Sequence, residues 1–228
     1  FFSNETVNAF NAEKYEDAIK YAEQAIESAK AANYKEALEQ SKYVMALSYE
    51  VLKNTAKANE LYRELIKENT KKPDVYIKIF AANQAEKQTD KAINVLKRGV
   101  KNLPENAQLK ALLGSTYLQA GQKEEAEKIV QSLLALGEKK EVFNYVGDIY
   151  RDASDIAKAE EYYNKSLALE PAQSEAYFGL ASTYFNKGID VLKEADKVPL
   201  DDMTGAYDKL KNESFDYFRK AIPNYRKV

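Results

Sequence analysis

The stretch KAEEYYNKSLALEPAQ at residues 158–173 decides the fold of this chain, because related versions of it recur upstream. The related stretches are KANELYRELIKEN (57–69), KAINVLKRGVKNLPEN (91–106) and EAEKIVQSLLALGE (125–138). Their shared alanines are Ala58, Ala92, Ala126 and Ala159, at spacings of 34, 34 and 33 residues. A constant period of this length predicts stacked copies of one structural unit.

Two further sets of residues keep the same period. Small residues stand twelve positions before the alanines at Ala46, Gly114 and Gly147, whereas Phe80 occupies the matching position of one unit. Tyrosines recur at Tyr49, Tyr117, Tyr150 and Tyr184. We expect the small residues to let two helices cross closely and the tyrosines to fill the space beside each crossing.

The pattern of apolar residues within each unit predicts two helices. Apolar residues recur at helical spacing from Leu109 to Tyr117, the segment 120–122 (AGQ) interrupts the pattern, and a second apolar stripe runs from Ala126 to Leu134. Pro104 and Pro171 follow the second helix of their units, where a helix can end. The predicted unit is therefore a helix–turn–helix.

These residues resemble the tetratricopeptide repeat (TPR), a helix–turn–helix unit of 34 residues. The resemblance rests on Leu113, Gly114, Tyr117, Gly121 and Ala126 in the fourth unit, on Phe143, Val146, Gly147, Tyr150, Ala159, Tyr163 and Pro171 in the fifth, on Tyr177, Leu180, Ala181 and Tyr184 in the sixth, and on Tyr15, Ala18 and Ala25 in the first. It implies an all-α fold, a right-handed α-solenoid of about six TPR repeats. The implied single array covers 1–228, with approximate repeats at 1–33, 34–72, 73–106, 107–139, 140–173 and 174–228.

Two places depart from the period. Ala18 and Ala58 lie 40 residues apart, so we expect about six extra residues at the junction around residues 31–39. An insertion of 21 residues precedes Ser214, which stands where an anchor alanine belongs. We interpret it as an extended helical hairpin, whose first helix runs to about Lys197 and ends at Pro199, with Asp201 or Asp202 capping the next helix.

Composition excludes several classes of function. The 228 residues include 34 Lys and Arg against 36 Asp and Glu, with no His and no Cys, and the net charge is −2. Without His or Cys there is no thiol nucleophile, no His proton relay and no zinc or haem site of ordinary ligation. A charge of −2 gives no electrostatic reason to expect nucleic-acid binding, and no apolar run is long enough to span a membrane.

We therefore expect no enzyme, no catalytic residue, no metal and no cofactor. Carboxylate pairs such as Asp148 with Asp152 and Glu160 with Glu161 are typical of solvated helix faces in a chain with 31% charged residues. An enzyme that used them would require a pocket and a carboxyl group with a raised pKa.

The resemblance also implies a binding surface, because the first helix of each TPR pair lines a concave groove. By this geometry the partner-binding residues are Tyr43, Leu47, Glu50, Ile77, Ala81, Gln84, Ala111, Ser115, Leu118, Asn144, Asp148, Arg151, Phe178, Ser182 and Phe185. The early positions are mostly apolar and Asp148 is acidic, so we expect a peptide with apolar side chains and a basic one near Asp148. The long hairpin could instead cover Phe178 and Phe185.

The predicted function is a non-catalytic protein–protein interaction scaffold that binds a peptide or a partner helix in this groove. The alternative is a self-associating component of the cell envelope that uses its C-terminal face, where Ile222 and Tyr225 need a cover. Some TPR domains hold the C-terminal carboxylate of a chaperone with a set of Lys, Asn and Arg side chains. In this sequence the matching positions carry Tyr43, Leu47, Lys78, Gln108 and Leu112 in one register and Ser3, Val7, Val44, Asp74 and Lys78 in another. Neither set can clamp a carboxylate, so we do not expect a chaperone's C-terminal carboxylate as the ligand.

The last repeat is similar to C-terminal repeats of TPR proteins from Bacteroidota, many of which are exported. This similarity favours a periplasmic or other extracytoplasmic location, with a cytoplasmic one left open. The sequence starts at Phe1 and not at Met, so we expect that an N-terminal segment has either been processed or been left out of this sequence.

Overall fold

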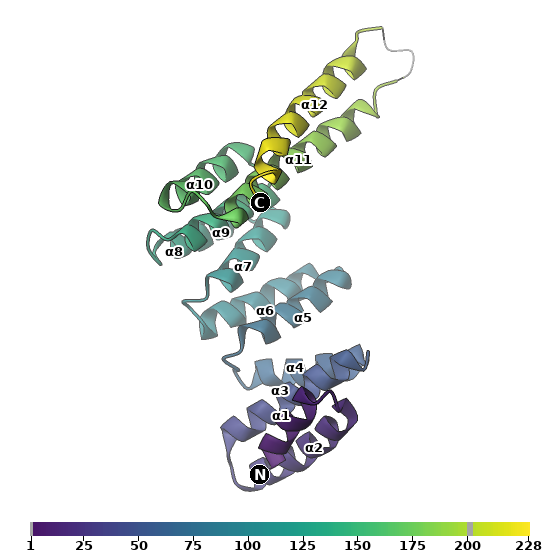
Figure 1. Cartoon of the computed structure of the whole chain (residues 1–228), viewed down its shortest axis with the longest axis vertical. Helices are drawn as coiled ribbons and strands as arrows, with labels where there is room; N and C mark the ends of the chain where they lie inside the picture. Colours follow the sequence, from purple (N-terminus) through teal and green to yellow (C-terminus); the bar gives the residue numbers. More distant parts are fainter. Residues whose placement is uncertain (1, 200–202) are drawn as a thin grey trace. The chain divides into compact units, whose positions relative to one another are not determined.

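The computed structural model describes residues 2–199 and 203–228 and shows twelve α-helices and no strand in these ranges. The helices are α1 (Phe2–Asn11), α2 (Tyr15–Ala31), α3 (Lys35–Val51), α4 (Thr55–Lys67), α5 (Pro73–Ala85), α6 (Thr89–Asn102), α7 (Ala107–Gln119), α8 (Lys123–Leu134), α9 (Lys140–Asp152), α10 (Ile156–Leu169), α11 (Ser174–Ala195) and α12 (Ala206–Tyr225), as Figure 1 shows. None of these helices is both long enough and apolar enough to cross a membrane.

The chain forms two compact units, Phe1–Leu109 and Lys110–Val228. Unit 1 contains α1 to α6 and the first residues of α7, and unit 2 contains the rest of α7 and all later helices. Within each unit, helices that follow one another in the chain pack side by side, such as α2 with α3 and α9 with α10.

The turns that follow α1, α3, α5, α7 and α9 share one hydrogen-bonding pattern. One residue there takes a left-handed conformation: Glu13, Lys53, Lys87, Gly121 or Ser154. The next amide then donates back to a carbonyl in the last turn of the first helix, for example Gln122 N to Tyr117 O at 2.8 Å. This pattern satisfies carbonyls that the helix end would leave unpaired. The interruption predicted at residues 120–122 is this turn.

The extra residues near the first junction lengthen helices rather than a loop. α2 and α3 contain 17 residues each, whereas α4 and α5 contain 13. Only residues 32–34 separate α2 from α3, and Asn33 is left-handed there. The expectation of a longer junction was therefore correct in position, but the added residues continue the helical hydrogen bonding on both sides of a short turn.

The repeat tyrosines form much of the core. Tyr62, Tyr76 and Tyr163 are fully buried, and Tyr49, Tyr117, Tyr150 and Tyr184 are nearly so. Tyr15 and Tyr177 occupy the equivalent positions but are only half-buried. Burial raises the pKa of the Tyr76 and Tyr117 hydroxyls, because the ionised form would lose its hydration.

The last two helices form the long hairpin predicted from the insertion (Figure 1). α11 ends at Ala195, two residues before the predicted end, and α12 begins at Ala206, a few residues after the start implied by a cap at Asp201 or Asp202. Gly205, at a φ of 73°, occupies the N-cap position of α12. Asp201 and Asp202, predicted as caps, lie outside the described residues. Ser214 is buried and its hydroxyl donates to the Gly188 carbonyl at 2.8 Å, so a small residue is needed where the two helices cross.

Candidate functional site

In unit 1, six of the predicted groove residues lie on α3 and α5: Tyr43, Leu47, Glu50, Ile77, Ala81 and Gln84. Ala81 is exposed and the other five are half-buried. Leu47, Ile77 and Ala81 therefore offer apolar surface on the first helices of two consecutive pairs.

The polar members of this group are engaged with neighbouring helices. Glu50 accepts hydrogen bonds from the Tyr62 hydroxyl at 2.9 Å and from the Lys78 ammonium at 2.6 Å. The Tyr43 hydroxyl donates to the Asp74 carboxylate at the start of α5. Burial and the adjacent carboxylates raise the pKa of Tyr43 and of Tyr62, so both phenols stay neutral at ordinary pH. These contacts hold α3 against α4 and α5.

Lys78, the one cation common to both carboxylate-binding registers considered above, is paired with Glu50. Lys42 also lies in unit 1, where it is buried and pairs with Glu64 at 2.8 Å and Glu68 at 2.6 Å. These ion pairs of Lys42 were not predicted, because burial of a lysine depends on how α3 and α4 face each other.

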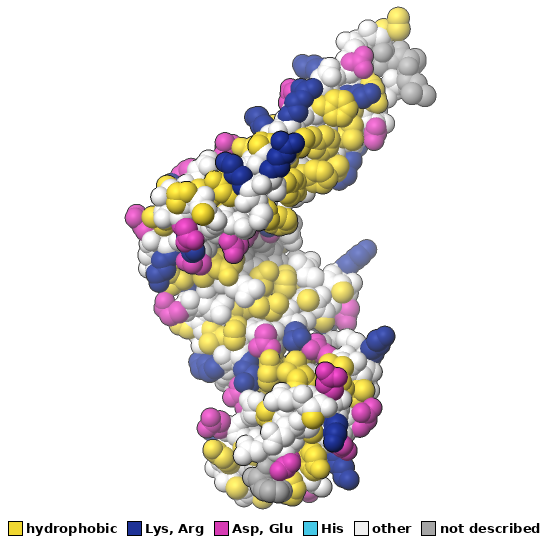
Figure 2. All heavy atoms as spheres, in the orientation of Figure 1, with side chains coloured by type: hydrophobic (Ala, Val, Ile, Leu, Met, Phe, Trp, Pro, Cys, Tyr) yellow, Lys and Arg dark blue, Asp and Glu magenta, His cyan; other side chains and the backbone are white. Residues whose placement is uncertain are grey.

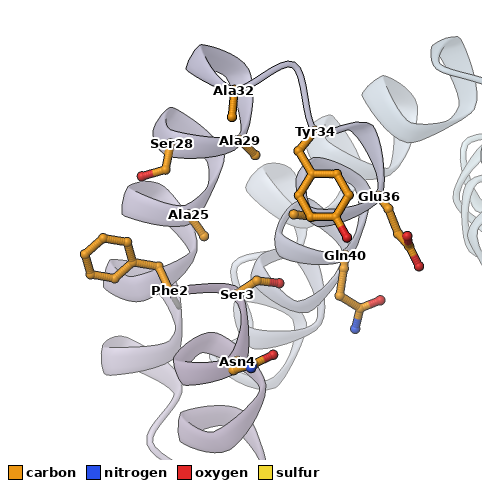
Figure 3. Close-up of a pocket in the computed structure, with 11 residues that line it drawn as sticks. Phe2, Ser3, Asn4, Ala25, Ser28, Ala29, Ala32, Tyr34, Glu36 and Gln40 are labelled. Carbon is orange, nitrogen blue, oxygen red and sulfur yellow. The ribbon is translucent and has the colours of Figure 1, made fainter.

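A cavity of about 730 Å³ lies at the end of unit 1 that contains the start of α1 (Figure 3). It is bounded by Phe2 and Ser3 of α1, by Ala25 and Ala29 of α2, and by Tyr34 beside α3. The sequence analysis did not include it in the site.

In α7, three predicted groove residues differ in accessibility. Ala111 and Ser115 are buried, so they offer no surface to a partner and their assignment to the groove is corrected. Leu118, one turn further along, is half-buried and retains part of its side chain at the surface. Helical spacing gives the direction of these side chains along α7 but does not show that Ala111 and Ser115 are buried.

In unit 2, two adjoining clefts lie between α9 and α11. The first has a volume of about 300 Å³ and is lined by Lys140, Glu141, Asn144, Tyr145, Asp148, Gln173 and Glu175. The second, of about 460 Å³, is lined by Asp148, Arg151, Ser174, Glu175, Phe178 and Val228. Asp148 and Glu175 line both. The clefts bring together four residues predicted from the sequence: Asn144, Asp148, Arg151 and Phe178.

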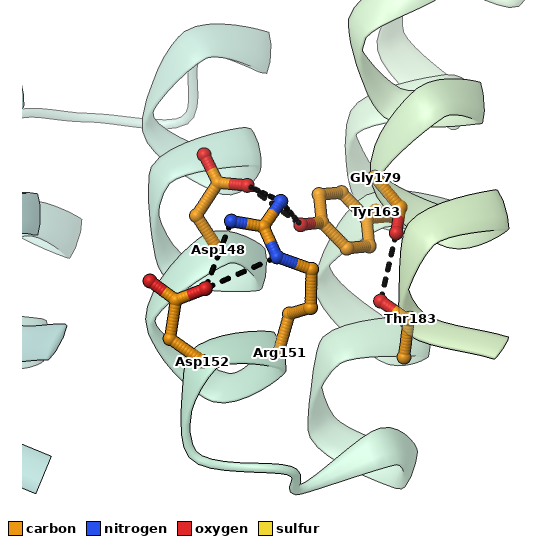
Figure 4. Close-up of polar contacts among 6 residues, drawn as sticks. All are labelled: Asp148, Arg151, Asp152, Tyr163, Gly179 and Thr183. Atoms are coloured by element: carbon orange, nitrogen blue, oxygen red, sulfur yellow. Dashed lines mark hydrogen bonds and ion pairs between the residues drawn. The ribbon is translucent and has the colours of Figure 1, made fainter. Parts of the chain in front are cut away.

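A polar network fixes one wall of these clefts (Figure 4). Asp148 accepts a hydrogen bond from the Tyr163 hydroxyl at 2.7 Å and pairs with Arg151 at 2.5 Å. Arg151 also pairs with Asp152 at 2.9 Å. Burial raises the pKa of the Asp148 carboxyl group, and the charge of Arg151 partly opposes this change. Asp148 and Asp152, which the sequence analysis considered as a carboxylate pair, thus both bind the guanidinium group of Arg151.

The Tyr163 ring lies between α9 and α11. A Cβ atom added at Gly147 would stand 2.8 Å from this ring, and one added at Gly179 would stand 2.3 Å from it. Only glycine leaves room on both sides, so these two positions let the ring reach Asp148. The sequence singled out Gly147 for this role and missed Gly179.

The remaining predicted residues lie on α11. Phe178 and Phe185 are exposed to 52% and 43%, although each also contacts a ring of the last helix, Tyr225 and Phe218 respectively. Ser182, between them, is half-buried. The hairpin therefore covers the two phenylalanines only in part.

Five residues of the first cleft were not predicted: Lys140, Glu141, Tyr145, Gln173 and Glu175. Lys140 and Gln173 lie at helix starts, where a repeat register assigns no groove position. Glu175 could have been found, because it stands three residues before Phe178 and so lies on the same helical face. Among the described residues, no group of acidic side chains is arranged to hold a metal ion.

Family models described as tetratricopeptide repeat match residues 52–114, 83–144 and 147–190, which together form more than half of the chain. The chain belongs to the tetratricopeptide repeat family. Its fold class is accordingly an all-α solenoid of helix–turn–helix repeats. TPR proteins are generally non-catalytic, and the fold supports a role as a protein–protein interaction scaffold.

Solved TPR structures resemble this chain closely enough to show the fold. A TPR protein from Parabacteroides merdae, a member of the Bacteroidota, superposes with a TM-score of 0.62 at 15% identity, over 99% of this chain and 90% of that one. YrrB, described as a TPR protein with an unusual peptide-binding site, superposes with a TM-score of 0.53 at 16% identity, over 77% of this chain and 88% of that one. The first similarity agrees with the resemblance to Bacteroidota proteins.

Curated proteins also match part of this chain. Protein IFIT1 homolog B of Homo sapiens is 24% identical over 132 residues, which are 58% of this chain and 28% of that protein. This chain therefore matches less than a third of the length of that relative. A structure of an IFIT1 monomeric mutant with Gppp-AAAA superposes with a TM-score of 0.52 at 18% identity, over 99% of this chain and 52% of that one.

Proposed function

We propose that this TPR chain is a non-catalytic scaffold that binds a peptide segment or a partner helix along the first helices of its pairs. The observation that carries the proposal is the pair of adjoining clefts between α9 and α11. They are lined by Asn144, Asp148, Arg151 and Phe178, which the repeat register assigns to a groove. The peptide-binding site described for YrrB is a precedent within the same fold.

The surface on α3 and α5 also supports the proposal. Leu47, Ile77 and Ala81 keep apolar atoms at the surface, while Glu50 and Tyr43 are held by neighbouring helices. Such a surface is already ordered before a partner arrives, so binding loses little conformational entropy there. We further propose that the helix pairs constitute six repeats of a single array, as the period of the sequence predicts.

The non-catalytic part of the proposal rests on the surroundings of Asp148. Its raised pKa has a structural cause, because the carboxylate is buried beside the Tyr163 hydroxyl and the Arg151 guanidinium. A carboxylate held by two such donors is positioned to support the fold. We assign it no proton-transfer role.

A peptide-display library panned on the purified chain tests this function. Replacing Leu47 and Leu118 together by Glu should lower the affinity for selected peptides at least tenfold, about 1.4 kcal/mol, because each charge would be desolvated on binding. The melting temperature should change by only a few degrees, since both leucines are partly exposed. The matched control is the pair Leu52→Glu and Leu169→Glu, two exposed leucines outside the predicted groove.

Equal binding by the groove variant and the control would contradict the proposal. Unfolding of the Leu47→Glu, Leu118→Glu variant would instead show that these leucines belong to the core and that the groove register is wrong. Failure of the library to yield any binder would contradict peptide binding altogether.

Nucleic acid is the partner class suggested by the IFIT1 structure with Gppp-AAAA. That similarity, at 18% identity, concerns the fold alone. Phosphate binding requires a surplus of Lys and Arg on the surface concerned, whereas this chain has a net charge of −2. We therefore keep the prediction of a protein partner, and Gppp-AAAA serves as a control ligand that should not compete with selected peptides.

One observation favours the alternative of self-association in an envelope component. α12 exposes Phe215, Ile222 and Tyr225 to between 40% and 49%, and Figure 2 shows hydrophobic side chains gathered along α11 and α12 beside Lys and Arg. If this face joins two copies, light scattering should show a dimer whose fraction rises with concentration and falls in an Ile222→Glu variant. A monomer at every concentration would exclude this alternative.

A further inference from the structure

The first cleft between α9 and α11 has more acceptors than donors. Its two nearest cations already have partners: Lys140 pairs with Glu170 and lies 4.0 Å from a Glu141 oxygen, and Arg151 pairs with Asp148 and Asp152. Glu141 and Glu175 add two more carboxylates to the lining. Carboxylates thus outnumber cations five to two in the cleft and its ion pairs, and the field inside it favours a positive charge.

Asn144 adds an observation that does not depend on charge. Its side-chain nitrogen donates to Gln173 Oε1 at 2.9 Å, whereas its Oδ1 atom is buried with no hydrogen-bond donor. Gln173 is itself occupied, because its amide nitrogen donates to Ser166 Oγ at 2.7 Å. An unsatisfied buried acceptor costs free energy, so a ligand that supplies a donor at this point would be favoured.

The chemistry of the lining narrows the ligand to one class. A lysine ammonium or an arginine guanidinium carries only donors and matches both the surplus carboxylates and the free Asn144 oxygen. The ring of Tyr145 also lines the cleft, where its face can stabilise a cation. A carboxylate or phosphate group would meet like charge at Glu141, Asp148 and Glu175.

The second cleft specifies a neighbouring side chain of different character. It shares Asp148 and Glu175 with the first cleft and adds the exposed ring of Phe178. In an extended peptide, alternate side chains point the same way and lie about 7 Å apart. Two adjoining clefts can therefore receive residues two positions apart in one strand.

We propose that the paired clefts recognise a protein segment with a Lys or Arg followed two residues later by an apolar residue. The cation would lie in the first cleft, near Glu141, Asn144 and Glu175, and the apolar side chain would lie against Phe178. This inference rests on the proposed scaffold function and specifies the ligand of the same site.

Three peptides of otherwise Gly and Ser sequence test the assignment: Lys-Ser-Leu, acetyl-Lys-Ser-Leu and Lys-Ser-Ser at the centre. Acetylation removes the charge and retains the length of the side chain. In NMR titrations, Lys-Ser-Leu should shift the side-chain amide signals of Asn144 and the backbone amide of Phe178. The other two peptides should bind at least tenfold more weakly, and the affinity of Lys-Ser-Leu should fall as salt is added.

The variant Glu141→Gln, Glu175→Gln should bind Lys-Ser-Leu about tenfold more weakly. The matched control is Glu124→Gln, Glu213→Gln, which removes the same charge from exposed positions outside both clefts and should bind as the natural sequence does. Asn144→Leu provides a second variant. It removes the Asn144 Oδ1 acceptor without changing the net charge, and it should also weaken binding of Lys-Ser-Leu.

Equal binding of the acetylated peptide, or equal binding by the Glu141→Gln, Glu175→Gln variant, would overturn the cation assignment. Peptides from the display library could still bind at Leu47 and Leu118 in that case, so the scaffold function would stand. Absence of any shift at Asn144 and Phe178 with Lys-Ser-Leu would overturn the site itself.

Discussion

Replacing Gly179 by alanine is expected to lower the free energy of unfolding by about 3 kcal/mol, the upper part of the range for overpacked cores. The added Cβ atom would stand 2.3 Å from two ring carbons of Tyr163. The ring cannot move aside easily, because Gly147 also packs closely against it and its hydroxyl is held by Asp148. Urea unfolding followed by circular dichroism measures the loss.

Two further variants show whether the Tyr163 ring is the cause. Combining Gly179→Ala with Tyr163→Leu should cost less than the sum of the single changes, because the shorter side chain leaves room for the added methyl group. Gly114→Ala should cost less than Gly179→Ala. Its Cβ would stand 2.8 Å from Ile149 Cδ1, the end of a flexible side chain that can rotate. A loss below about 0.5 kcal/mol for Gly179→Ala would contradict the packing described here.

Replacing Gly188 by leucine is expected to separate α11 from α12 and to cost about 2–3 kcal/mol. Even a Cβ atom at this position would stand 2.5 Å from Phe218 Cε1. The change would also disturb the hydrogen bond from Ser214 Oγ to the Gly188 carbonyl, which lies at the same crossing. Two constraints at one crossing make this the most sensitive point of the hairpin.

Hydrogen exchange measured by mass spectrometry locates the effect. The amides of α12 should exchange faster in Gly188→Leu. Those of α9 and α10 should keep their protection, because these two helices pack against each other and against α11, whereas α12 packs mainly against α11. Asn186→Leu is the matched control, since Asn186 is exposed on the same helix. Unchanged protection of α12 in Gly188→Leu would show that the crossing does not hold the hairpin together.

The candidate site was predictable in part. The repeat register placed Asn144, Asp148, Arg151 and Phe178 on surfaces that line clefts. It also placed Ala111 there, which is buried, because a register gives the direction of a side chain but not what packs over it. Sequence spacing within one helix cannot report the neighbouring helix.

The polar connections were the least predictable feature. Tyr163 was expected only as a packing residue, yet its hydroxyl joins α10 to Asp148 of α9. Gln173 was not considered, yet it receives the Asn144 amide and leaves Asn144 Oδ1 without a donor. Both contacts link residues more than twelve positions apart, so they depend on how helices face each other.

The sequence by itself determined the helix pairs and the family. Ala58, Ala92 and Ala126 recur with a period of 34 residues, and each period contains one helix–turn–helix unit whose two helices cross closely at a small residue. Each such unit depends on contacts within a short stretch of chain. Only the tertiary structure decided which side chains are accessible, as with buried Ala111 and exposed Phe178. It also decided that Asp148 and Glu175 border the same two clefts, since burial and the sharing of a cleft arise from the packing of helices distant in sequence.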